Sequence, residues 1–144
     1  SSLLTYGVDN NKIYNNVYNS NEISKLKLLS VALKNLELII DKKTALMHIC
    51  QNDLIKNNYK KGDSEGIVNY GLTLSGIQFS VIFIEDENEK NKFKISFRSK
   101  EDFPCNQFAS SFFDGGGHTN AAGGIFKGNL NSAIEYFKKS LNEF

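Results

Sequence analysis

Hydrophobic residues recur with two different spacings along the chain, and each spacing predicts one kind of element. Residues 77–84 are apolar at nearly every position, which is typical of a strand covered on both faces, whereas residues 93–100 alternate strictly between apolar and polar. Two further β-rich runs, residues 36–40 and 44–50, are separated by a polar triplet and predict a hairpin that opens a sheet. Residues 125–127 predict one more strand beside the others.

Helical spacing appears between and around these strands. Ile23, Leu26, Leu29, Leu33 and Leu36 follow one another at intervals of three or four, so they predict an amphipathic helix. Other helices are predicted at residues 9–17, 53–55, 65–75, 105–112 and 129–141. Helices interleaved with strands predict an α/β fold with a single mixed β-sheet and flanking helices, preceded by an α-helical linker. We place the linker at residues 1–35 and the sheet domain at residues 36–144.

Composition narrows the classes of function. A net charge of +1 on 144 residues argues against a protein that coats nucleic acid through a broad basic surface. No apolar run approaches the roughly 20 residues of a membrane span. Cys50 and Cys105 lack zinc or redox spacing, so we interpret both as buried, reduced residues of a cytoplasmic protein without a membrane partner.

A run of glycines offers the first candidate chemistry. Gly115, Gly116 and Gly117 lack a Cβ, so the backbone can take positive φ and turn several N–H groups toward one anion. His118 adds a titratable donor, and residues 118–122 are predicted to start a helical turn whose N–H groups point the same way. A flexible hairpin loop is the alternative for such a run. The small residues that follow, Ala-Ala-Gly-Gly at 121–124, suggest close packing against a sheet instead.

The alternating strand predicted at residues 93–100 offers the second group of candidate binding residues. Its polar face carries Lys94, Ser96, Arg98 and Lys100, while Phe93, Ile95 and Phe97 face the core. An ordinary solvated strand face explains Lys94 and Lys100 well. Arg98 differs, because a guanidinium between two serines can hold two phosphate oxygens.

These segments carry a family resemblance. The run GGGH, two residues, then AAGG at 115–124 resembles the signature of the DHH-associated domain, the C-terminal domain of DHH-superfamily phosphoesterases. GDSEGIVN at 62–69 and ISFRSK at 95–100 make the chain most similar to the oligoribonuclease and phosphoadenosine-phosphate phosphatase branch. The resemblance implies a substrate-binding domain that contacts nucleotide through Ser96, Arg98, Gly115, Gly116, Gly117 and His118. Glu65 either faces the nucleoside or simply begins a helix.

Metal ligands are scarce. The only histidines are His48 and His118, and neither belongs to a cluster with the carboxylates that a two-metal site needs. His48 alternates with apolar residues, which favours packing on a sheet face. We therefore expect no catalytic and no metal-binding residue in this chain. The resemblance implies that manganese binds in a preceding DHH domain, and we expect the sequence to be the C-terminal part of a longer enzyme.

The resemblance leaves several functions open. It implies hydrolysis, by the whole enzyme, of short single-stranded RNA and of adenosine 3′,5′-bisphosphate, with little base preference because few aromatic platforms are evident. A phosphodiesterase for cyclic or linear dinucleotides would share the same motifs. A non-catalytic tRNA-binding module, similar to the C-terminal domain of alanyl-tRNA synthetase, is the alternative of another class, although that domain resembles GGGR and here the fourth residue is His118. The pattern does not indicate an oligomeric state.

Overall fold

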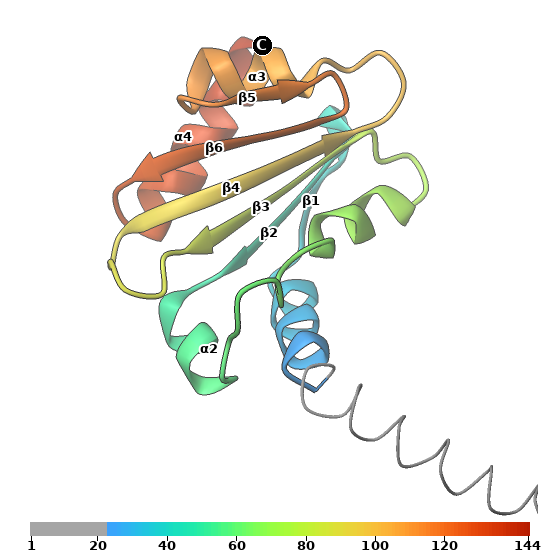
Figure 1. Ribbon diagram of the computed structural model, residues 1–144. Helices are drawn as coiled ribbons and strands as arrows, with labels where there is room; N and C mark the ends of the chain where they lie inside the picture. Colours follow the sequence, from blue (N-terminus) through green and yellow to red (C-terminus); the bar gives the residue numbers. More distant parts are fainter. Residues whose placement is uncertain (1–22) are drawn as a thin grey trace, which may run out of the picture.

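A single six-stranded mixed sheet organises the chain. The computed structural model describes residues 23–144, and the strands run in the order β1-β2-β3-β4-β6-β5 (Figure 1). The pair β2–β3 is parallel, and every other neighbouring pair is antiparallel. The strands are β1 (Glu37–Ile39), β2 (Thr44–Ile49), β3 (Phe79–Glu85), β4 (Lys92–Ser99), β5 (Gly116–His118) and β6 (Ala121–Lys127).

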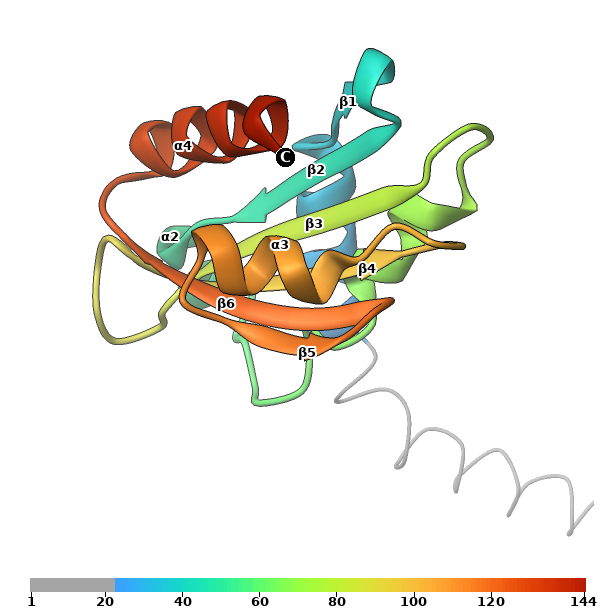
Figure 2. The same cartoon turned by 90° about the horizontal axis from the view of Figure 1, so that it is seen from above.

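Helices cover both faces of this sheet, as the view from above shows (Figure 2). On one face lie α3 (Cys105–Phe112) and α4 (Leu130–Glu143). On the other lie the helix over residues 23–34, α2 (Gln51–Lys56) and the 3₁₀ helix η2 (Ile67–Thr73). A short 3₁₀ turn, η1 (Ile40–Lys42), joins β1 to β2.

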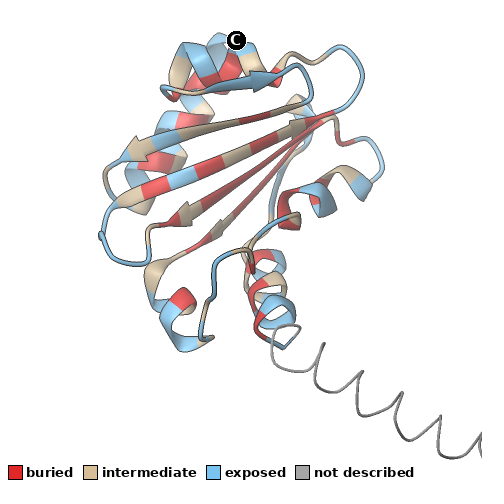
Figure 3. Ribbon diagram, in the orientation of Figure 1, coloured by how far each residue is buried: buried red, intermediate tan, exposed pale blue. Residues whose placement is uncertain are grey.

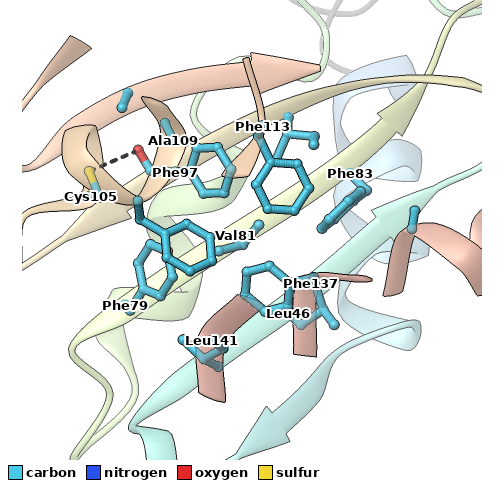
Figure 4. Close-up of a cluster of buried hydrophobic side chains, with 14 of the residues drawn as sticks. Leu46, Phe79, Val81, Phe83, Phe97, Cys105, Ala109, Phe113, Phe137 and Leu141 are labelled. Atoms are coloured by element: carbon cyan, nitrogen blue, oxygen red, sulfur yellow. Dashed lines mark hydrogen bonds between the residues drawn. The ribbon is translucent and has the colours of Figure 1, made fainter. Parts of the chain in front are cut away.

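The face under α3 and α4 holds an aromatic core. Phe79, Phe83 and Phe97 from the strands pack with Phe108 from α3 and Phe137 from α4, and all five are fully buried. Figure 4 shows the strand residues of this cluster together with Phe137. Their ring centroids lie 5.2–6.1 Å apart in the contacts that Phe79 makes with Phe97, Phe108 and Phe137. Aromatic pairs at this spacing add to the hydrophobic stabilisation of the buried area. This layer packs against β3 and β4, the two middle strands of the sheet.

The opposite face is only partly covered. Met47, Ile49 and Ile82 pack with Leu28, Ala32 and residues of α2 and η2, which shields β2 and β3. Beyond β3, the residues of β4 on this face, Lys92, Lys94, Ser96 and Arg98, are all exposed or partly exposed, and β5 is exposed throughout (Figure 3). The uncovered part of the sheet therefore consists of β4, β6 and β5.

The predicted fold class is confirmed, and so are most of the predicted elements. The hairpin of residues 36–50, the central strand near 79–85 and the strictly alternating strand all form. The final helix begins after Asn129, whose side-chain Oδ1 accepts a hydrogen bond from Ser132 N at 2.8 Å. Residues 65–75 form a 3₁₀ helix over 67–73.

Two predictions about helices were wrong. The stripe predicted on the helix at 23–34 is only partly its buried face. Leu29 and Leu36 pack against the core, but Ile23, Leu26 and Leu33 are 53%, 61% and 44% exposed, and the fully buried residues are Leu28 and Ala32. The helical turn predicted at 118–122 is instead a two-residue turn between β5 and β6. The helix predicted at 9–17 lies outside the described residues.

Among the helices that the structure describes, none is both long enough and apolar enough to cross a lipid bilayer.

Candidate functional site

An open groove of about 550 Å³ lies over the uncovered strands. Ser96 and Arg98 of β4 form one side, and Gly115, Gly116 and Gly117 form the other, with residues of β6 as the floor between them. Five of the six residues predicted as substrate contacts therefore line one cavity. His118, the sixth, does not line it.

The strand register explains how these residues meet. Arg98 pairs with Ala121, and Ala121 pairs with His118, so the three Cβ atoms point to the same face of the sheet. Two strand spacings separate Arg98 from His118, which is about 10 Å. A second row places Ser96 across from Gly123, and Gly123 across from Gly116. Small residues in the middle strand thus keep the space between Arg98 and His118 open, and His118 is positioned at the rim.

The guanidinium of Arg98 is anchored and still has free donors. Its Nη1 donates to the carbonyl oxygen of Phe97 at 2.9 Å and to that of Ala122 at 3.4 Å. No acceptor in residues 23–144 takes a hydrogen bond from Nε or Nη2, so these donors remain for a ligand. Lys94 and Arg98 bring two positive charges to the lining and Asp114 brings one negative charge, which leaves +1. The groove therefore suits an anion.

Glycines in and before β5 allow its backbone to pack closely against the backbone of β6. A Cβ on Gly115 would lie 1.8 Å from Gly123 O, and a Cβ on Gly117, whose φ is +150°, would lie 2.5 Å from Ala121 O. Gly124 in β6 faces the core, where a Cβ would lie 2.8 Å from Phe113 Cβ. A Cβ on Gly116 would meet nothing within 4 Å. Three glycines thus serve packing, and Gly116 is the one that opens toward the groove.

The predicted convergence of three glycine amides is wrong in part. Gly115 N donates to Ala109 O at 3.1 Å, which ends α3 and removes that N–H from any ligand. Only Gly117 of the three has positive φ, and the segment is the edge strand β5. An edge strand still leaves some of its backbone donors unpaired on the outer side. The groove can bind an anion through β5, although not through a nest of successive amides.

The turn between β5 and β6 is held in place by the side chains of Asn120 and Ser99. Asn120 Nδ2 donates to Ser99 Oγ at 2.9 Å and to Glu101 O at 3.2 Å. Ser99 Oγ also lies 2.7 Å from Phe103 O. These bonds tie the glycine hairpin to the end of β4, next to Arg98. Asn120 is accounted for by this structural role.

A second cavity, of about 610 Å³, adjoins the first on the same face of the sheet. It lies between β3, β4 and the segment that leads into η2, and Lys94, Ser96 and Arg98 line both cavities. Glu65 lines this second cavity, whereas Lys100 lines neither. Lys94 is therefore a site residue that its position on an alternating strand could not distinguish from an ordinary surface lysine.

The two cysteines lie at the starts of helices, Cys50 before α2 and Cys105 in the first turn of α3. Cys105 is buried, as predicted, while Cys50 is only half-buried, so the prediction was wrong for Cys50. Burial raises the pKa of both thiols, which keeps them protonated. Within residues 23–144, no group of three His, Cys, Asp or Glu side chains lies close enough together to hold a metal ion. The described residues do not supply a manganese site.

His48 gives a prediction about stability. It lies half-buried on β2, and burial lowers its pKa, although Asp53 and Glu37 partly oppose that shift. A lowered pKa in the folded state means that the unfolded state takes up a proton first as the pH falls below about 6.5. We expect the free energy of unfolding to decrease from pH 7.5 to 5.5, and His48→Gln to reduce that decrease. Urea unfolding at both pH values measures it, with His118→Gln as matched control. An unchanged pH dependence in His48→Gln would contradict this assignment.

Comparison with known proteins identifies the family of this domain. Residues 41–144 match the DHHA1 domain. A solved structure described as an exopolyphosphatase-related protein from Bacteroides fragilis is 40% identical, covers 98% of this chain and has a TM-score of 0.80. A pGpG-specific phosphodiesterase from Vibrio cholerae is 12% identical over 92% of the chain, with a TM-score of 0.58, and supports the fold.

The chain spans 41% of the length of each of these two structures. No curated protein matches it. The match to residues 41–144 takes in β2 to α4, and thus both sides of the groove. The chain belongs to the DHHA1 family, the DHH-associated domain that accompanies DHH phosphoesterases.

Proposed function

We propose that this chain is the substrate-binding domain of a manganese-dependent phosphoesterase that hydrolyses short RNA oligonucleotides and adenosine 3′,5′-bisphosphate. One observation carries the proposal: Arg98, with free guanidinium donors, and Ser96 face Gly116 and Gly117 across one open, net positive groove. A phosphate between them accepts two N–H bonds from Arg98 and one O–H bond from Ser96. His118 approaches from the rim.

In this proposal residues 36–144 bind the substrate and residues 1–35 connect it to a preceding DHH domain. The residues of that domain would hold manganese, and the ion would supply a polarised water for hydrolysis. The role of this chain is to position the substrate. It holds the phosphate and so directs the bond to be cleaved toward the DHH domain. Holding the reactants in place lowers the barrier by several kcal/mol without any group of this chain entering the bond chemistry. The names of the two similar structures, which both concern cleavage of phosphate-containing substrates, support this choice of chemistry.

Binding and turnover by the purified chain test the proposal. We expect 5′-phosphorylated diadenylate, adenosine monophosphate and adenosine 3′,5′-bisphosphate to bind in isothermal titration calorimetry. We expect no hydrolysis of any of them, with or without manganese, because the described residues hold no metal site. Metal-dependent turnover by this chain would contradict the division of roles.

Substrate preference distinguishes our proposal from two alternative functions. With the complete enzyme, faster turnover of cyclic or linear dinucleotides than of short RNA and the bisphosphate would favour a dinucleotide phosphodiesterase. Tight binding of tRNA by this chain, together with weak mononucleotide binding, would favour a tRNA-binding module. Our proposal expects no tight tRNA complex, because the basic residues of the groove are confined to Lys94 and Arg98.

A further inference from the structure

The two cavities on the open face differ in lining, and they meet at β4. The glycine-side cavity is lined by backbone and small residues, with Ile95 and Ile125 as its large apolar residues. The cavity on the other side of β4 has an apolar floor, and charged residues stand around it. The apolar residues are Leu54, Tyr59, Val68, Ile82 and Ile84, and the charged residues outside β4 are Lys61, Glu65, Glu85, Asp86 and Glu87. Arg98, Ser96 and Lys94 form the ridge that both cavities share.

We infer that the second cavity is a nucleobase subsite, in which a purine lies against Ile84 and Val68 while its phosphate is held by Arg98. This inference rests on the proposed function, because it takes the phosphate site as given. It also gives the orientation of the bound nucleotide, which extends from the phosphate site beside β5, across β4, toward the segment before η2. A nucleotide has a charged end and a flat apolar end, and the two cavities offer matching surfaces in that order.

The floor of this subsite is firmly built. Leu54, Val68 and Ile82 are 1%, 2% and 1% exposed, because they belong to the core layer beneath the cavity. The carbonyl of Val68 accepts a hydrogen bond from Ser80 Oγ at 2.7 Å, which fixes η2 against β3. Ile84 is only half-buried, and its register partner on the same face is Lys94. A planar ring that settles on Ile84 removes apolar surface from water without rearranging the core.

The wall that faces β4 is also held. Asp63 is 5% exposed, and its Oδ2 accepts from Ser24 Oγ at 2.8 Å and from Lys60 N at 2.9 Å. These bonds pin the segment that carries Glu65 to the helix over residues 23–34. Glu65 itself is exposed at the rim and offers an acceptor to the amino and hydroxyl groups of a nucleoside.

Of the three other acidic residues around the cavity, Glu85 and Asp86 are engaged in hydrogen bonds, and Glu87 is exposed at the rim. Glu85 accepts from Gln51 N at 2.8 Å and from Asn91 N at 2.7 Å. Asp86 accepts from Asn88 N and Glu89 N, and these bonds lower the pKa of its carboxyl. An apolar floor without directed donors discriminates by size, because a purine buries more surface than a pyrimidine. We expect a preference among ring sizes and none among sequences.

Calorimetric titration with adenosine monophosphate, cytidine monophosphate and ribose 5-phosphate tests the subsite. In the unsubstituted chain we expect adenosine monophosphate to bind about tenfold more tightly than ribose 5-phosphate, with cytidine monophosphate between them. Ile84→Gln replaces part of the floor by a polar chain of similar length. It should remove most of the tenfold advantage and leave the affinity for ribose 5-phosphate unchanged.

The matched control is Ile55→Gln, at a position that is 63% exposed and outside both cavities. It should change neither affinity. Amide NMR shifts provide an independent map: adenosine monophosphate should perturb residues 64–68 and Ile84 in addition to the groove around Arg98, whereas ribose 5-phosphate should perturb only the groove. Equal affinities and equal maps for the two ligands would overturn the subsite while leaving the phosphate site standing. Failure of both ligands to bind would overturn the proposed function, and the subsite with it.

Discussion

Replacing Arg98 by alanine is expected to weaken nucleotide binding at least tenfold without changing the fold. The side chain lies at the junction of the two cavities, and its Nε and Nη2 donors are the ones that a phosphate would use. Hydrogen bonds to a charged group contribute about 1.5–3 kcal/mol, which corresponds to a tenfold change or more in Kd. Calorimetry with adenosine monophosphate measures the loss, and circular dichroism checks the fold.

Three further variants make this result specific. Lys100→Ala removes the same charge from the next exposed lysine, outside both cavities, and should leave the affinity nearly unchanged. Arg98→Lys keeps the charge but loses the planar fork, so it should restore binding only in part. His118→Ala should weaken binding as well, because the register places this side chain on the face of Arg98. Full affinity in both Arg98→Ala and His118→Ala would show that the nucleotide binds elsewhere.

A methyl group on Gly115 is expected to destabilise the domain by about 2 kcal/mol or more, whereas one on Gly116 should leave stability within about 0.5 kcal/mol. The two positions are neighbours in sequence and differ in what they face. A Cβ on Gly115 would lie 1.8 Å from Gly123 O, so the hairpin must move, while one on Gly116 would meet nothing within 4 Å. Urea unfolding of Gly115→Ala and Gly116→Ala gives both values.

The variants Gly115→Ala and Gly116→Ala also distinguish an effect on stability from an effect on ligand binding. In Gly116→Ala the methyl group projects over the groove, because Gly116 shares a face with Gly123 and Ser96. We expect this variant to fold normally and to bind adenosine monophosphate several-fold more weakly. If Gly116→Ala bound as tightly as the unsubstituted chain, the phosphate would not approach β5 closely, and the role assigned to this strand would be wrong.

Much of the fold followed from hydrophobic spacing, because in this chain spacing and burial agree in the strands. Phe93, Ile95 and Phe97 alternate in sequence and are all buried on one face. The helix over 23–34 shows where that logic ends. Leucine is spaced regularly at 26, 29 and 33, yet the helix turns Leu28 and Ala32 to the sheet, since the tertiary contacts of β2 and α2 decide which side is covered.

The sequence allowed the residues of the candidate site to be predicted, but not how those residues are arranged. The glycines, Ser96 and Arg98 could be named from motifs, but the pattern GGGH suggested a loop and a helical turn, and it forms a strand. The reason is the neighbour: β6 provides a full-length partner at residues 121–127, and an extended glycine segment pairs with it more favourably than it forms an isolated turn. The second cavity could not be foreseen, because it joins residues 54–68 to residues 82–98, and only the sheet topology brings those segments together.

The single parallel pair in the described sheet has a consequence for how the domain assembles. The pairs β3–β4 and β5–β6 are hairpins that can form from local contacts, and β4 meets β6 across residues 100–120. By contrast, β2 meets β3 only after the longer segment of residues 50–78 has crossed over. Those residues contain the wall of the proposed base subsite. During refolding, the proposed phosphate surface should therefore mature before the proposed base subsite, and a trapped early species would retain sugar phosphates while discriminating poorly between nucleotides.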